Sequence, residues 1–345
     1  MSPQSPGDAV NSGGKVRPFR RGIALAGTVL AAIAVVSACS SSGGAPASSG
    51  GGADAGHANT KRITIAMVTH AAPGDTFFDI VRKGAQAAAD KDNVDLKYSS
   101  DPQAPNQANL LQTAIDSKVD GIALTLPSAS ALATGVKNAQ AAGIPISGFN
   151  AGFDDWKALG IKQYFGQNET LAGNAAGERL SQEGVKHVVC LIQQQGQVQL
   201  ESRCAGTKAK FNGQFETLNV NGEDMTSVTS TLAAKLQQDP SIDAVLTLGA
   251  PIAMAAVDVV PANSHTKIYT FDTNAALVNA IKEGKVQWAI DQQPYLQGYL
   301  AVDSLWLEIN NGDTIGGGDA TLTGPTFIDK SNIDSVAKYA EAGTR

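Results

Sequence analysis

The sequence has few of the residues on which most enzymes depend. Of its 345 residues only three are cysteine and four are histidine, and the histidines are scattered without HExxH or another zinc-binding spacing. It also lacks a GxSxG nucleophile motif, a Walker phosphate loop, a GxGxxG fingerprint and an acidic calcium loop. We therefore expect no metal, no cofactor and no catalytic centre, so that the protein is not an enzyme.

No apolar run reaches the roughly 20 residues that a membrane-spanning helix needs. The run from Ile23 to Val36 has 14 residues, follows four basic residues and precedes the small pair Ser37-Ala38. This basic, apolar and small-residue order is typical of an export peptide. Residues 1–38 are therefore predicted to be a signal peptide, and the rest of the chain to be soluble and extracytoplasmic.

Acidic residues outnumber basic residues. The chain carries 26 Lys and Arg against 32 Asp and Glu, and removal of residues 1–38 leaves 22 against 31, a net charge of −9. Nucleic acids are bound mainly through basic residues. We therefore expect no nucleic-acid partner.

Cys39 stands between the predicted signal and a segment composed almost entirely of Ser, Gly and Ala (40–60). Such a composition behaves as a flexible coil with little apolar surface to bury. The order Val-Ser-Ala-Cys at 36–39 resembles the lipobox of bacterial lipoproteins, in which the cysteine is lipidated and becomes the new N-terminus. The resemblance implies lipidation at Cys39 and a tether over 39–60 that holds a domain outside the cytoplasmic membrane. An ordinary secreted protein with a stray cysteine is the alternative.

The other two cysteines, Cys190 and Cys204, are an even pair in a chain with an export signal. Such a pair favours a disulfide bond. Closing a loop of that size would contribute about 3 kcal/mol in the chain-entropy model. Two buried free thiols are the alternative.

Short apolar strands alternate with longer helical patterns from Arg62 onward. The first round predicts strands at 62–68, 94–100, 121–126 and 144–149, and helices at 77–91, 107–118 and 129–143. The second begins near Tyr164, with strands at 186–192, 215–220, 243–248, 267–271 and 286–290 and helices starting near Glu169, Leu200, Ser227, Pro251, Asn274 and Pro294. Near-continuous apolar strands between helices indicate parallel sheets covered on both faces. The predicted fold class is α/β, with two doubly wound lobes.

Neutral amides, carboxylates and aromatic residues follow these strands. In open parallel sheets, ligands bind beyond the carboxyl ends of the strands. Amides and carboxylates exchange hydrogen bonds with vicinal hydroxyls, while aromatic faces cover the C–H patches of a sugar. The strand ends therefore favour a neutral polyhydroxylated ligand; they include 70–78, 150–152, 193–197, 272–274 and 291–293.

Six segments, in this order, resemble the ribose-binding-protein-like, type I periplasmic sugar-binding proteins of ATP-binding cassette importers. They are GDTFFDIVRKGAQAAA (74–89), VDGIALTLPSASAL (119–132), AAGIPISGFNAG (141–152), YFGQNETLAGNAAGERL (164–180), RCAG (203–206) and residues 267–301. The resemblance covers residues 62–330 and implies two lobes, joined by a three-strand hinge, that close over one ligand. It implies an N-terminal lobe of 61–164 plus about 293–322, and a C-terminal lobe of 165–292 plus about 323–345.

The resemblance also implies ligand-binding residues in the first lobe. Phe77 and Phe78 occupy the family's paired-aromatic positions, and Asp75 stands where an Asn commonly contacts a hydroxyl. Asn150 stands where an Asp usually receives hydroxyl protons. A core role for one of the two phenylalanines is the alternative for that pair. Trp156 is a further candidate, because its loop could reach the cleft.

In the second lobe, Arg203 matches an arginine of the family's second helix, Asp272 the carboxylate after Phe271, and Gln292 the glutamine at the hinge. A surface ion pair is the alternative for Arg203, and a helix cap is the alternative for Asp272. Gln194 and Asn274 are further candidates.

The chain departs from the family at Leu126 and Gly249, where Asn is usual. A buried polar group without its partner costs about 1–3 kcal/mol, so ribose itself is disfavoured. The segment FNAG (149–152) resembles a subgroup that takes pentoses, polyols or inositol-like ligands.

We therefore expect a monomeric, lipid-anchored receptor that captures a small neutral sugar or polyol, such as a pentose, a pentitol or an inositol-like ligand. It would deliver this ligand to the permease and ATPase subunits of an importer, and its lipid anchor would be its sole contact with the membrane. A sensor subunit that presents a ligand to a membrane receptor is the alternative. A ligand-responsive repressor would need an N-terminal helix-turn-helix, where this chain has an export signal.

Overall fold

The computed structural model describes residues 57–261 and 263–345. The predicted signal peptide, Cys39 and all but the last four residues of the predicted tether lie outside the described residues, so these assignments stay predictions. Among the residues that are described, no helix combines the length and the apolarity that crossing a bilayer requires.

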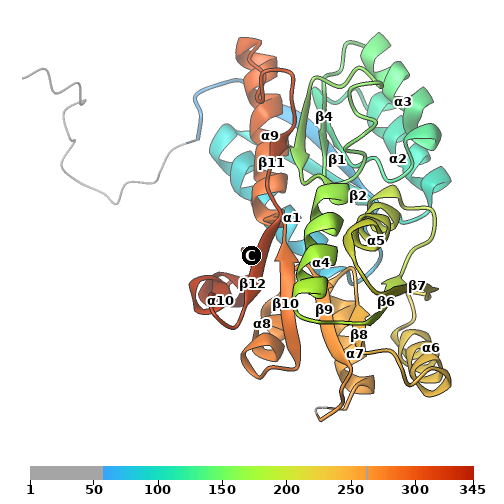
Figure 1. The fold of residues 1–345 in the computed structure, drawn as a ribbon. Coiled ribbons are helices and arrows are strands. Elements are labelled where there is room, and N and C mark those ends of the chain that lie inside the picture. Colours follow the sequence, from blue (N-terminus) through green and yellow to red (C-terminus); the bar gives the residue numbers. More distant parts are fainter. Residues whose placement is uncertain (1–56, 262) are drawn as a thin grey trace, which may run out of the picture. The chain divides into compact units, whose positions relative to one another are not determined.

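The first lobe is a parallel six-stranded sheet with helices on both faces (Figure 1). Its strand order is β11-β5-β4-β3-β1-β2. The strands are β1 (Ile63–Thr69), β2 (Val94–Ser100), β3 (Gly121–Leu124), β4 (Ile146–Phe149), β5 (Gln163–Gly166) and β11 (Thr321–Leu322). One face packs on α1 (Thr76–Asp92) and α9 (Pro294–Asn311), and the other on α2 (Ala104–Asp116) and α3 (Ala129–Ala141).

The second lobe repeats this arrangement with the strand order β12-β10-β9-β8-β6-β7. Only the pairing of β12 with β10 is antiparallel. The strands are β6 (His187–Ile192), β7 (Gln214–Asn219), β8 (Ala244–Leu246), β9 (Lys267–Phe271), β10 (Val286–Asp291) and β12 (Thr326–Asp329). One face packs on α4 (Glu169–Gln182) and α5 (Val198–Lys210), and the other on α6 (Met225–Gln238), α7 (Ala250–Val259), α8 (Ala275–Lys282) and α10 (Asp334–Glu341).

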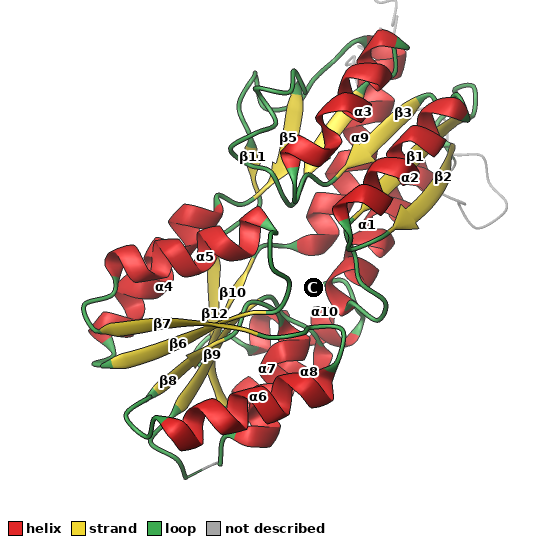
Figure 2. Cartoon of the chain, turned by 90° about the vertical axis from the view of Figure 1, so that its right-hand side faces the viewer, coloured by secondary structure: helices red, strands yellow, loops and turns green. Residues whose placement is uncertain are grey.

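The chain passes from one sheet to the other after β5, after β10 and after β11 (Figure 2). The predicted fold class, two parallel-sheet lobes joined by three connections, is confirmed. The predicted second round at Tyr164 begins too early, because Phe165 pairs with Phe149 of β4 and β5 extends the first sheet through Gly166. The sequence pattern also missed β11, β12 and α10, of which β11 has only two residues.

Glycines bring α4 and α5 into backbone contact. A Cβ atom at Gly173 would overlap the carbonyl oxygen of Arg203, and one at Gly177 would overlap that of Thr207. Gly206 of α5 in turn faces the carbonyl oxygen of Thr170. Only residues without a side chain allow this approach. As a result, α5 rests directly on α4.

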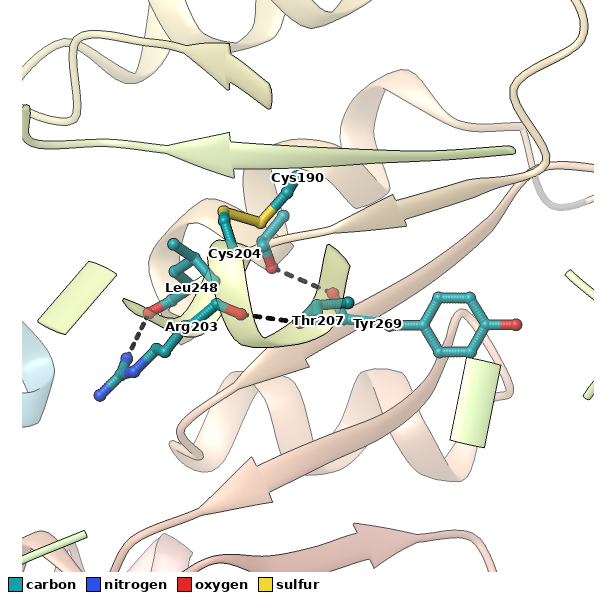
Figure 3. The surroundings of a disulfide bond; sticks show 7 residues. Cys190, Arg203, Cys204, Thr207, Leu248 and Tyr269 are labelled. Carbon is teal, nitrogen blue, oxygen red and sulfur yellow. Dashed lines mark hydrogen bonds between the residues drawn. A yellow bond between two sulfur atoms is a disulfide. The ribbon is translucent and has the colours of Figure 1, made fainter. Parts of the chain in front are cut away.

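A disulfide bond ties the same helix to the sheet. Cys190 of β6 and Cys204 of α5 form the bond predicted from the cysteine count, with their Cα atoms 6.0 Å apart (Figure 3). Both residues are buried. Arg203 precedes Cys204, and its guanidinium donates from Nη1 to the carbonyl oxygen of Leu248 at 3.1 Å. The bond therefore anchors α5 directly beside Arg203.

Replacing both cysteines, in the variant Cys190→Ala/Cys204→Ala, should lower the free energy of unfolding by about 3 kcal/mol. The loss follows from the greater chain entropy of the unfolded state when residues 14 apart are no longer joined. Urea denaturation measures it, and the wild-type protein in reductant should show the same decrease. An unchanged unfolding midpoint in the double variant would contradict the stabilising role.

Candidate functional site

A cavity of about 120 Å³ lies where the carboxyl ends of the two sheets face each other. About 10–15 Å³ of such space holds one water, so the cavity suits a single small molecule. Eight of the ten predicted ligand-binding residues line it. They are Asp75, Phe77, Phe78, Asn150, Gln194, Arg203, Asp272 and Gln292.

Arg203 forms a buried, two-point ion pair with Glu169. Its Nε atom donates to Oε2 at 2.6 Å and Nη2 donates to Oε1 at 3.1 Å, with the two residues 2% and 5% exposed. Burial opposes the charge of the guanidinium, but Glu169 and Asp272 outweigh burial and raise the pKa of Arg203. The arginine is therefore cationic, and its partner is not the surface carboxylate of the alternative interpretation.

Asp272 follows β9 in the left-handed region, with φ of +64°. Its Oδ1 accepts from Gln292 Nε2 at 2.7 Å, and its Oδ2 lies 3.7 Å from Arg203 Nη1. Burial raises the pKa of Asp272 to about 7, although Arg203 and Gln292 work in the opposite direction. The helix-cap alternative is wrong, because Asn274 caps α8 by accepting from the Leu277 N–H at 2.8 Å.

Asn150 occupies the corresponding place in the first lobe. It follows β4 with φ of +63°, and its N–H donates to Phe165 of β5, as the N–H of Asp272 donates to Ile290 of β10. Asn and Asp adopt this conformation more readily than most residues. The Asn150 amide donates to Gln292 Oε1 at 3.3 Å, so Gln292 joins the strand ends of both lobes.

The paired phenylalanines form an aromatic wall at the start of α1. The rings of Phe77 and Phe78 meet edge to face, 5.3 Å apart, and both line the cavity and pack in the core of the first lobe. Lining the cavity and packing in the core are therefore not alternative roles for this pair. Asp75 caps α1 by accepting from the Phe77 N–H at 3.0 Å. Desolvation raises the pKa of Asp75 to about 6, against the backbone N–H groups of Phe77 and Phe78.

Two predicted ligand contacts lie outside the cavity. Trp156 is buried in the core of the first lobe and stacks on Tyr164. Besides capping α8, Asn274 donates to Thr76 Oγ1 at 3.2 Å and so joins the two lobes. For both residues, a structural role replaces the predicted one.

Several lining residues were not predicted individually: His70, Gln193, Gln197 and Gln199. The strand-end rule pointed to the segments that hold His70, Gln193 and Gln197. Gln199 had no such signal, because it lies within the first turn of α5. Glu169 gave only the signal of an acidic residue at the start of a helix.

One group of potential metal ligands, His187, Glu216 and Asp239, lies among the described residues. His187 Nε2 bonds to Glu216 Oε1 at 2.9 Å, and its Nδ1 bonds to Ser241 Oγ at 2.8 Å. The ammonium group of Lys235 bonds to the other oxygen of Glu216. These hydrogen bonds account for the group without a metal ion.

Comparisons with known proteins agree on one family. The model of the periplasmic binding protein domain matches residues 65–314. A carbohydrate transporter from Acidothermus cellulolyticus 11B, solved in complex with myo-inositol, is 61% identical; the alignment covers 83% of this chain and 100% of that one, with a TM-score of 0.81.

Two curated relatives are more distant. The xylose/arabinose-binding protein of Sulfolobus acidocaldarius is 24% identical over 70% of this chain, and the match spans 64% of that relative's length. The ribose import binding protein of Bacillus subtilis is 24% identical over 71% of this chain and 81% of its own.

Removing the partner of Arg203 should destabilise the fold strongly. In Glu169→Ala a guanidinium stays buried without its carboxylate, which costs about 3 kcal/mol or more. Urea denaturation measures the change, and Glu178→Ala, at an exposed position of the same helix, should stay within about 0.5 kcal/mol of wild type. Equal stability of the two variants would contradict the role assigned to the ion pair.

Proposed function

This chain belongs to the periplasmic binding protein domain family, and on that premise we propose that it captures myo-inositol or a closely related cyclic polyol for an ATP-binding cassette importer. The observation that carries the proposal is the 61% identity to the Acidothermus cellulolyticus protein solved with myo-inositol. The family consists of solute-binding proteins, so its function is binding and not catalysis.

The chemistry of the cavity supports such a ligand. A cyclic polyol carries hydroxyl groups around its ring and apolar C–H groups on its faces. Phe77 and Phe78 offer an apolar wall for a ring face, and Asp272 offers oxygens that accept from hydroxyls. Arg203 supplies N–H donors, while the amides of Asn150 and Gln292 both donate and accept. Together these groups match a ligand in which every hydroxyl is both donor and acceptor.

The hinge side of the cavity supports capture by closure. Gln292 lies directly after β10, where the chain passes between the lobes, and its amide group contacts Asn150 on one side and Asp272 on the other. A ligand that contacts both strand ends stabilises the closed arrangement of the lobes selectively. The free energy of binding then drives the change that a permease recognises.

The location and the partners follow from the family and the sequence together. Membership of the family supports a location outside the cytoplasm and permease and ATPase subunits as partners. Lipidation of Cys39, a tether over 39–60 and a monomeric state complete the proposal. For the lobes we propose the predicted bounds with one change. The first segment of the N-terminal lobe ends at Gly166 and not at residue 164, because β5 pairs with β4 in the first sheet.

Wild-type protein from Ser40 onward should bind myo-inositol in preference to ribose, xylose and arabinose. A ligand at a thousandfold excess over its Kd stabilises the folded state by about 4 kcal/mol, which a thermal-shift assay detects. Calorimetric titration then gives the Kd. Stabilisation by a pentose alone would exclude inositol but keep a sugar-binding function, and no response to any of these ligands would reject the proposal.

Affinity should rise with pH through about 7. Hydroxyl donors on the ligand favour the ionised form of Asp272, so binding should lower its pKa from about 7 and release a proton. The stability of the ligand-free protein should change with pH in the opposite direction to the affinity. Burial raises the pKa of Asp272 above its ordinary 3.8, so the stability that Asp272 contributes is lost as pH rises through about 7.

Calorimetry at pH 5.5 and 8, in buffers of different ionisation enthalpy, measures both the affinity and the released proton. Asp272→Asn should abolish the change near pH 7. Asp75→Asn is the matched control, because it removes the other cavity carboxyl with a raised pKa and should leave the response near pH 7 in place. Proton uptake on binding would contradict this role of Asp272.

A further inference from the structure

Buried polar side chains form a continuous hydrogen-bonded chain across the two lobes. In the first lobe, Gln107 Nε2 donates to Thr125 Oγ1 at 3.2 Å, and Thr125 Oγ1 bonds to His70 Nδ1 at 2.8 Å. Across the cleft, His70 Nε2 lies 3.0 Å from Gln199 Nε2, which also donates to Gln197 Oε1 at 2.8 Å. All five residues are at most 5% exposed.

The nitrogen of the Gln199 amide lies toward both His70 and Gln197. Burial, and then the charge of Arg203, lower the pKa of His70 to about 3, so its imidazole is neutral and has one donor and one acceptor. Because an amide nitrogen only donates, Nε2 of His70 accepts and Nδ1 donates to Thr125. Both N–H bonds of Gln199 are then used, one by His70 and one by Gln197.

The carbonyl oxygen of the Gln199 amide takes no part in this hydrogen-bonded chain. Gln199 lines the cavity, and its Oε1 is buried without a hydrogen-bond partner among the described residues. Gln193 also lines the cavity, and its Oε1 is likewise buried without a hydrogen-bond partner among the described residues. The Gln193 side chain lies next to Gly249, because a Cβ at Gly249 would be in ordinary van der Waals contact with Gln193 Nε2 at 3.5 Å.

Buried acceptors of this kind need a donor, and the cavity beside them is where a hydroxylated ligand would supply it. We propose that Gln199 and Gln193, which line the same cavity, select the ligand: each carbonyl oxygen accepts from a ligand hydroxyl, and the Gln199 contact forms only when His70 of the opposite lobe orients its amide. The inference rests on the proposed function and adds two specificity-determining residues to it.

Selectivity for hydroxyl groups distinguishes this role from a purely structural one. A site built to accept from a hydroxyl rejects an analogue that lacks it, because the protein acceptor is then left unpaired. A side chain that only held the lobes together would change the affinity for every ligand by the same factor. The readout is therefore the pattern of affinities across ligands and not the affinity for one of them.

The experiment measures Kd by calorimetry for myo-inositol and for a panel of inositols in which one hydroxyl is removed or inverted, with wild type, Gln199→Met and Gln193→Met. Each variant should bind myo-inositol about 5- to 150-fold more weakly. Each should also lose the wild-type discrimination against one panel member while keeping it against the others. Gln195→Met, at an exposed position of the same loop, should behave as wild type.

Gln193→Met keeps the test decisive if Gln199→Met does not fold, because no hydrogen bond of the Gln193 side chain to another described residue is lost. Equal weakening across the whole panel, or no weakening, would overturn the inference while the proposed function stands. Failure of the wild-type protein to bind any inositol would overturn both.

Discussion

The buried ion pair of Arg203 and Glu169 is the interaction on which the rest of the site depends. Burying two charges is costly, and it is tolerated only where geometry and further hydrogen bonds compensate for lost hydration. Here α4 and α5 meet backbone to backbone at Gly173 and Gly206, so that the two side chains align at two points. The disulfide bond at Cys204 holds α5 in that position. A rigid second lobe follows from these three constraints.

The ion pair also determines the electrostatics of the cavity. The charge of Arg203 is largely satisfied by Glu169, so it only partly offsets the burial of Asp272, whose pKa stays raised. The same charge adds to the burial that keeps His70 neutral and able to accept a hydrogen bond. The lining thus combines one balanced cation, two carboxyl groups whose pKa values are raised by burial, Asp75 and Asp272, and several neutral amides. Such a surface suits an uncharged ligand better than an ion.

The sequence allowed the fold to be predicted well, because alternating apolar strands and helices are local signals. The strand KIYTF was predicted to the residue, and the strand ends with Asn150 and Asp272 do line one cavity. Contacts that depend on side-chain direction could not be predicted. Trp156 lies in a suitable loop but faces the core, and Gln199 lines the cavity from the first turn of α5, where the sequence showed no binding signal. The pairing of Glu169 with Arg203 joins residues 34 positions apart and has no local pattern.

The left-handed residues at the two strand ends reveal an approximate twofold symmetry. The strand orders of the sheets correspond member by member, with β4 equivalent to β9 and β5 to β10, and Asn150 and Asp272 occupy equivalent places. A ligand between them meets an amide on one side and a carboxyl group on the other. The half-sites also differ in their other lining residues, with Phe77 and Phe78 in the first lobe and Arg203 in the second. These differences break the symmetry, so a ring with nearly equivalent hydroxyls can still be held in one orientation.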